Sequence, residues 1–140
     1  MRASIHIARP RRAVYEFVAT PRTWAMWHPG RVAVSGVVDR PPDVGEHVTE
    51  KVAFAGMQTR LAWEVTTRKA PERWSMSAQL PRRGEAALAF KLAPKGRGTL
   101  LECEIAYNGV NLLVDALHVR PRILAEARSS LARLKEVLEA

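Results

Sequence analysis

Residues 57–107 read MQTRLAWEVTTRKAPERWSMSAQLPRRGEAALAFKLAPKGRGTLLECEIAY. Apolar and polar residues alternate within this stretch over four segments, which are 57–66, 73–80, 85–92 and 99–107. Such alternation is typical of a strand that buries one face. Short turns rich in proline and glycine separate the segments, so we predict four neighbouring antiparallel strands.

The residues before this run predict three more strands and two short helices. The additional strands are expected over 4–8, 32–38 and 47–54. Residues 11–19 carry apolar side chains at three- and four-residue spacing, which indicates an amphipathic helix. Thr20 as an N-cap and Pro21 at the first helical position predict a second short helix that ends at Trp27.

The C-terminal segment changes to helical periodicity. Its apolar residues recur at three- and four-residue steps, at Leu124, Ala127, Leu131, Leu134 and Leu138. This spacing predicts a long amphipathic helix with one apolar stripe. Because proline inside a helix produces a kink, two arrangements are open around Pro121. Either the helix begins near Arg120, or a shorter turn over 111–119 precedes it with a break at Pro121, and we favour the break.

This order of elements resembles the helix-grip fold of the START-like (SRPBCC) superfamily. The resemblance rests on IHIARP followed by VYEFV, on PRTWAMWHP and on LARLKEVLE, at residues 5–10, 14–18, 21–29 and 131–139. The aromatic-rich stretch looks like the second helix of bacterial polyketide cyclase/dehydrase-type members. The resemblance covers nearly the whole chain. It is specific for the fold more than for the function, because the superfamily uses one scaffold for many activities.

The fold that the resemblance implies is an α+β helix-grip fold in one domain, residues 1–140. It has a curved antiparallel sheet of about seven strands, counting the N-terminal one. Two short helices follow the first strand, and a long C-terminal helix lies across the concave face. The resemblance also implies a deep, mostly apolar cavity between the sheet and that helix, the kind of concave site that small molecules occupy.

The residues expected to bind a ligand in this cavity have apolar or aromatic side chains on the inward faces of the predicted elements. They are Trp24, Trp27, Phe54, Leu61, Trp63, Trp74, Met76, Leu88, Phe90, Cys103, Ile105, Tyr107, Leu117 and Leu124. Ala127 would help to close the cavity from the helix side. The alternative that these side chains pack on one another as a solid core stays open.

Three polar residues are candidates for catalysis, namely Tyr107, Glu50 and His28. Glu50 shares the inward alternation of Val48 and Val52, and a carboxylate on an apolar face can act as a general acid or base. The Tyr107 hydroxyl, at the end of the last strand, could hydrogen-bond a ligand carbonyl. His28 follows the aromatic helix and is a candidate at the mouth of the cavity.

Several kinds of chemistry are not supported by the sequence. The four histidines lie on four different elements and lack the spacing of metal ligands, so we expect no metal site. Cys103 is the single cysteine; it is predicted to be buried and inert, and it excludes a disulfide framework. The chain has no glycine-rich phosphate loop and no Rieske cysteine–histidine pairs, so no cofactor is expected.

Length and charge narrow the class of protein further. A chain of 140 residues with 47% apolar residues predicts one folded domain, and no segment reads as a signal peptide or a membrane span, so we expect a cytoplasmic protein. The net charge of +8 comes from short basic groups beside prolines and glycines. We interpret them as solvated surface, with no specific nucleic-acid partner. Peripheral contact with a membrane and a homodimer both remain open.

Three functions follow, in decreasing order of preference. The first is binding of a small hydrophobic ligand such as a lipid, polyketide or aromatic metabolite. The second is a cyclase/dehydratase-like enzyme that acts on a polyketide-like substrate. The third is docking of the basic surface on an anionic membrane or an acidic partner.

Overall fold

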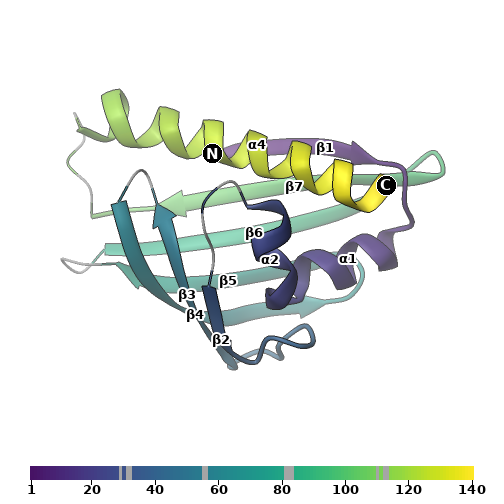
Figure 1. Cartoon of the computed structure of the whole chain (residues 1–140), viewed down its shortest axis with the longest axis horizontal. Helices are drawn as coiled ribbons and strands as arrows, with labels where there is room; N and C mark the ends of the chain where they lie inside the picture. The colour runs from purple at the N-terminus through teal and green to yellow at the C-terminus, as the bar shows by residue number, and fades with distance from the viewer. Residues whose placement is uncertain (29, 31–32, 55–56, 81–83, 110, 112–113) are drawn as a thin grey trace.

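The computed structural model describes the chain except residues 29, 31–32, 55–56, 81–83, 110 and 112–113, and describes the backbone alone at 54, 57 and 116. Figure 1 shows one sheet, a long helix along one side of it and short helices near that helix's C-terminal end. The described elements are β1 (Arg2–Ile7), α1 (Arg11–Ala19), the 3-10 turn η1 (Pro21–Thr23), α2 (Trp24–Trp27), β2 (Ala33–Gly36), β3 (His47–Phe54), β4 (Met57–Lys69), β5 (Arg73–Leu80), β6 (Gly84–Lys95), β7 (Gly98–Tyr107), the π-helix η3 (Asp115–Val119) and α4 (Arg120–Glu139).

The sheet is the predicted antiparallel one, with seven strands in the order β1-β7-β6-β5-β4-β3-β2. Strands β2 to β7 pair with their neighbours in sequence, whereas β1 pairs with β7 from the other end of the chain, with Ile5 opposite Leu101. The hairpin between β6 and β7 turns through Gly96 and Arg97, since Lys95 is opposite Gly98. Gly96 has a φ of +59°, which glycine adopts without steric cost.

Alternation places the core on one face of the sheet. On β5, Trp74, Met76 and Ala78 are buried while the residues between them are more exposed. Trp74 lies opposite Phe90 of β6, and both side chains point into the core beneath the helices. The inward residues that the sequence predicted on these two strands are therefore on the expected face.

Some predicted boundaries were wrong. β2 ends at Gly36 instead of residue 38, because Gly36 has a φ of +101° and packs against the backbone of His47. The segment after Thr20 begins as a 3-10 turn, and Thr20 does not cap it: its hydroxyl donates to the carbonyl of Glu16 at 2.5 Å. Strand β4 extends to Lys69, beyond the predicted end at residue 66.

The predicted break at Pro121 is also wrong. The π-helix η3 continues directly into α4, and the N–H of Arg120 donates to the carbonyl of Asp115 across the junction. Pro121 lies in the first turn of α4, where a missing backbone N–H and a φ near −65° are tolerated. A change in helix type therefore takes the place of a break in the chain.

The apolar stripe of α4 faces the core as predicted, except at its beginning. Leu131, Leu134 and Leu138 are buried, but the next buried aliphatic side chain toward the N-terminus is Ile123, whereas Leu124 is half-buried. Ile123 lies four residues before Ala127, and the 3.6-residue period allows either a three- or a four-residue step. Hydrophobicity alone does not distinguish two adjacent aliphatic residues.

The C-terminal end of α4 is attached to the segment between β1 and α1. The Ala8 N–H donates to the Glu139 carboxylate at 2.8 Å, the Arg9 guanidinium donates to the Leu138 carbonyl at 3.0 Å, and the Lys135 ammonium donates to the His6 carbonyl at 2.7 Å. α4 also packs against β1 and α2 (Figure 1). None of the described helices is long and apolar enough to cross a membrane.

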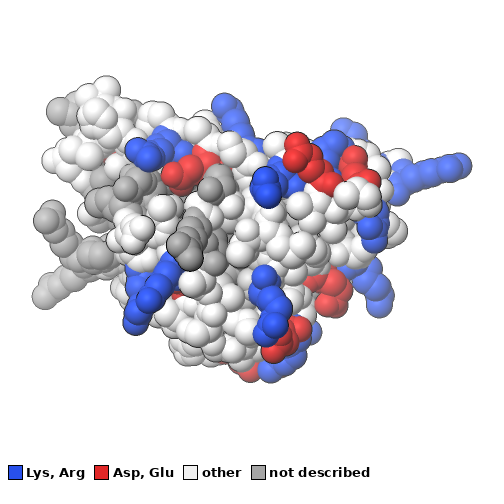
Figure 2. All heavy atoms as spheres, viewed as in Figure 1, with Lys and Arg blue, Asp and Glu red and all other residues white. Residues whose placement is uncertain are grey.

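On the face of the molecule that Figure 2 shows, the basic residues are spread out instead of forming one patch. In Figure 2, Lys and Arg are scattered across the visible face, and acidic residues lie beside several of them. Arg40 pairs with Glu46 at 2.8 Å and Lys135 pairs with Glu139 at 2.7 Å. Exposed pairs of this kind stabilise a fold weakly. Their distribution agrees with a solvated surface.

Candidate functional site

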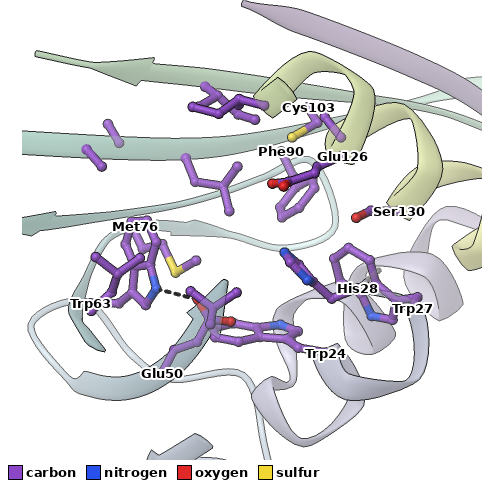
Figure 3. A pocket seen from close by; sticks show the side chains of 18 of the residues that line it. Trp24, Trp27, His28, Glu50, Trp63, Met76, Phe90, Cys103, Glu126 and Ser130 are labelled. Carbon is purple, nitrogen blue, oxygen red and sulfur yellow. Dashed lines mark hydrogen bonds between the residues drawn. The ribbon is translucent and has the colours of Figure 1, made fainter. Parts of the chain in front are cut away.

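A mostly apolar cavity of about 120 Å³ lies between the sheet, α2 and α4 (Figure 3). Strands β3 to β7 supply most of its wall, the end of α2 closes one side, and one face of α4 covers it. Its lining residues are Trp24, Trp27, His28, Glu50, Val52, Leu61, Trp63, Met76, Ala86, Ala87, Leu88, Phe90, Cys103, Ile105, Ile123, Glu126, Ala127, Ser130 and Leu131.

Aromatic rings form much of the wall. Trp27 meets Phe90 edge-on, with the ring centroids 6.3 Å apart. The indole N–H of Trp24 donates to the Val18 carbonyl at 2.9 Å, and that of Trp27 lies 3.4 Å from the Thr23 hydroxyl. Because these N–H groups are used within the helical region, the two tryptophans offer the cavity apolar ring surface.

Glu50 is a buried carboxyl group in this apolar wall. Its residue is 6% exposed, and the Trp63 indole N–H donates to its Oε1 at 3.0 Å. Burial raises the pKa of Glu50, and the hydrogen bond from Trp63 opposes that rise in part. The predicted inward position of this side chain on β3 is the observed one.

His28 reaches the cavity from the end of α2. The backbone N–H of Gly30 donates to its Nδ1 at 3.0 Å, so the neutral ring carries its proton on Nε2. Burial lowers the pKa of His28, which favours this neutral form. Glu50 and His28 are thus titratable side chains of the cavity wall whose environment favours the uncharged state of each.

The family model for polyketide cyclase/dehydrase and lipid transport matches residues 1–139. The chain belongs to this family. The match confirms the resemblance seen in the sequence, and the helix-grip fold confirms the predicted fold class. Comparison with functionally curated proteins gives no match.

Solved structures similar to this polyketide cyclase/dehydrase-family chain share its fold. A protein from Arthrobacter aurescens superposes with a TM-score of 0.76 at 16% identity, over 99% of this chain and 84% of that one. Ara h 8.0201 gives 0.72 at 7% identity, over 99% and 96% of the two chains. DynU16, a protein of the dynemicin biosynthetic locus, gives 0.70 at 20% identity, over 100% of this chain and 47% of its own.

Nine of the residues predicted to bind a ligand line the cavity of this family member. They are Trp24, Trp27, Leu61, Trp63, Met76, Leu88, Phe90, Cys103 and Ile105. Ala127 also lines it, as expected. Whether these side chains contact a ligand stays a prediction. Burial raises the pKa of the Cys103 thiol to about 12, so this cysteine is a neutral part of the wall.

Four other predicted residues lie away from the cavity, and a fifth cannot be placed. Trp74 is fully buried under Trp24 and beside Phe90, and Leu124 is half-buried and not among the residues that line the cavity. Leu117 is 62% exposed on η3. The Tyr107 hydroxyl donates to the Asp115 carboxylate, and Tyr107 is not among the described residues that line the cavity. The Phe54 side chain lies outside the described residues.

Two polar lining residues, Glu126 and Ser130 of α4, were not predicted. They lie four residues apart on the helix face that covers the cavity, and Ser130 is buried. Glu126 pairs with Arg122 at 3.6 Å and Figure 3 shows its carboxylate turned toward the cavity. Their helical spacing relative to Ile123 and Ala127 is the sequence pattern that could have predicted their position on the cavity face.

Among the described residues, no three His, Cys, Asp or Glu side chains form a group that could hold a metal ion.

Replacing Glu50 with glutamine is expected to change how stability depends on pH. Because the folded pKa of Glu50 is raised above the ordinary value of 4.5, the folded state holds this proton more tightly than the unfolded chain. That contribution is complete at low pH and is lost as the pH rises through the folded pKa. The unfolding free energy of Glu50→Gln, measured with urea, should therefore improve relative to wild type as the pH is raised.

The exposed Glu64 of the neighbouring strand supplies the control. Glu64→Gln should show no comparable trend over the same pH range. Parallel stability curves for Glu50→Gln and wild type would contradict the buried, proton-retaining carboxyl group.

Proposed function

We propose that this protein binds a small, largely apolar molecule of one or two rings in the cavity between the sheet and α4. The observation that supports this most directly is the cavity of about 120 Å³ with aromatic and aliphatic walls. An engineered apolar cavity of about 150 Å³ takes up benzene, whereas pockets for drug-sized ligands measure about 300–1,000 Å³. Size therefore favours an aromatic metabolite over a long-chain lipid or a multi-ring polyketide.

Ligand size provides the test. Acetophenone, 1-acetylnaphthalene and 1-acetylpyrene share one functional group and differ in ring number. Isothermal titration calorimetry should give saturable binding for the first two, and about tenfold or weaker affinity for the pyrene ketone. Three of the four tryptophans line the cavity, so tryptophan emission should change on binding. No saturable binding of the two smaller ketones would overturn the proposal, and tight binding of the pyrene ketone would overturn its size limit.

A cyclase/dehydratase-like activity is the second candidate, favoured by the presence of Glu50 and His28 in the same cavity. In its ionised form, the Glu50 carboxylate can take a proton from carbon and return it to the leaving hydroxyl group, which departs as water, while the Nε2–H of His28 donates a hydrogen bond to the carbonyl oxygen. Turnover distinguishes this function from binding alone: an enzyme would release water from a β-hydroxy ketone, and Glu50→Gln would stop the release while binding continued. Contact with an anionic membrane and homodimer formation stay predictions.

A further inference from the structure

We propose that the cavity selects uncharged ligands with a carbonyl-type oxygen, which accepts hydrogen bonds from the side chains of Glu50 and His28. The inference rests on the proposed binding function and names the chemical class of its ligand. Figure 3 shows both side chains pointing into the cavity, Glu50 from β3 and His28 from the end of α2. The rest of the wall is mostly apolar, so these two groups can set the orientation of a ligand.

One carboxyl oxygen of Glu50 accepts a hydrogen bond within the protein, and the other can bond a ligand. Trp63 donates to Oε1 at 3.0 Å, and Oε2 has no hydrogen-bond partner among the described residues. An indole N–H can donate to either form of the carboxyl group but cannot accept its proton. The proton of the neutral acid is therefore best placed on Oε2, which can donate it in a hydrogen bond to a ligand oxygen.

The His28 ring offers its Nε2–H as a hydrogen-bond donor to the cavity, because its other nitrogen is already occupied. The Gly30 N–H occupies Nδ1 at 3.0 Å, so the ring must carry its proton on Nε2 whenever it is neutral. A backbone N–H cannot exchange its role as donor, so this tautomer is maintained by the chain itself. Glu50 and His28 thus both offer O–H or N–H groups, and a carbonyl oxygen can accept two hydrogen bonds through its two lone pairs.

The other ionisable groups of the cavity disfavour an anionic ligand. Glu126 faces the cavity from α4 and pairs with Arg122, at 3.6 Å on the same helix. Cys103 contributes a neutral thiol from β7. None of the lining residues that the structure describes is Lys or Arg, so these residues offer no permanent cation to a ligand carboxylate. Burying an unpaired charge is expensive, and the Glu126 carboxylate, which Figure 3 shows turned toward the cavity, would add repulsion.

Three naphthalene derivatives of similar shape test whether the cavity prefers an uncharged carbonyl compound. At a pH below the raised pKa of Glu50, 1-acetylnaphthalene should bind about tenfold or more tightly than 1-ethylnaphthalene, because the hydrocarbon leaves the Glu50 and His28 donors without acceptors. The anion 1-naphthoate should bind more weakly than the ketone by at least as much. Isothermal titration calorimetry gives all three affinities on the same protein sample.

Two substitutions at Glu50 separate hydrogen bonding from cavity shape. Glu50→Gln keeps a donor in the form of an amide N–H, so it should retain the preference for the ketone. Glu50→Leu removes the donor and should reduce the preference to about threefold or less. Glu64→Gln on the exposed side of β4 is the matched control and should bind all three probes as wild type does.

The pH dependence gives an independent readout. As the pH rises through the raised pKa of Glu50, the wall loses a donor and gains a charge, so ketone affinity should fall. His28, Glu126 and Cys103 are the other titratable lining residues that the structure describes, and they are unchanged in Glu50→Gln. The fall attributable to Glu50 should therefore be absent in that variant.

The possible outcomes are distinct. Equal affinity for ketone and hydrocarbon, or a preference for 1-naphthoate, would overturn the selection while leaving apolar binding in place. A fall in ketone affinity with pH that is identical in wild type and Glu50→Gln would overturn the role of Glu50. Absence of binding by ketone and hydrocarbon alike would overturn the proposed function itself.

Discussion

Trp74→Ala is expected to lower the free energy of unfolding by about 3–5 kcal/mol, which is typical of deleting a large aromatic side chain from a core. Trp74 is 0% exposed. Its ring stacks on Phe90 of the neighbouring strand, with centroids 6.1 Å apart, and meets Trp24 of α2 edge-on at 6.1 Å. The substitution would therefore leave a void at the point where α2 packs on the sheet.

Urea denaturation would measure this effect, with Trp74→Phe as a second variant that retains an aromatic ring. The indole N–H of Trp74 is buried and has no hydrogen-bond partner among the described residues. Phenylalanine removes that unpaired group, which offsets part of the lost packing, and the expected cost is about 1–2 kcal/mol. Leu117→Ala, on an exposed side chain, should change stability by about 0.5 kcal/mol or less. Equal stability of all three variants would contradict a tightly packed core at Trp74.

Trp74 also illustrates why the cavity residues were predicted less well than the sheet. Alternation along β5 depends on that strand alone, and it correctly placed Trp74 and Met76 on the inward face. Whether an inward side chain lines a space or fills the core depends on what covers it. Trp24 covers Trp74, whereas Met76 remains open to the cavity. That difference arises between distant segments and has no signal in local periodicity.

The polar residues of the site also differ in how well the sequence predicts their positions. Glu50 was predictable because strand alternation relates it to Val48 and Val52, which are also buried. Tyr107 follows the same rule on β7, yet its hydroxyl donates to Asp115 of η3, an element beyond the end of the strand. The direction of His28 depends on the turn after α2 and on the N–H of Gly30. Single-strand patterns contain no information about such contacts.

Ala127→Leu is expected to weaken binding of 1-acetylnaphthalene by about tenfold or more. Ala127 lies on the face of α4 that covers the cavity, and leucine adds three carbon atoms to a space of about 120 Å³. Ligand and side chain would then compete for the same volume, since protein interiors are close-packed and yield little. Leucine is a good helix former and the added atoms fill empty space, so stability should change by about 1 kcal/mol or less.

Ala132→Leu makes the same substitution on the exposed side of the same helix, and it should bind the ketone as wild type does. Calorimetric titration of the three proteins separates occupation of the cavity from any general effect of leucine on α4. Loss of binding in Ala127→Leu alone would locate the ligand beneath the helix. Unchanged binding in both variants would contradict the cavity as the binding site, because an occupied cavity of this size cannot also accept a leucine side chain without expansion.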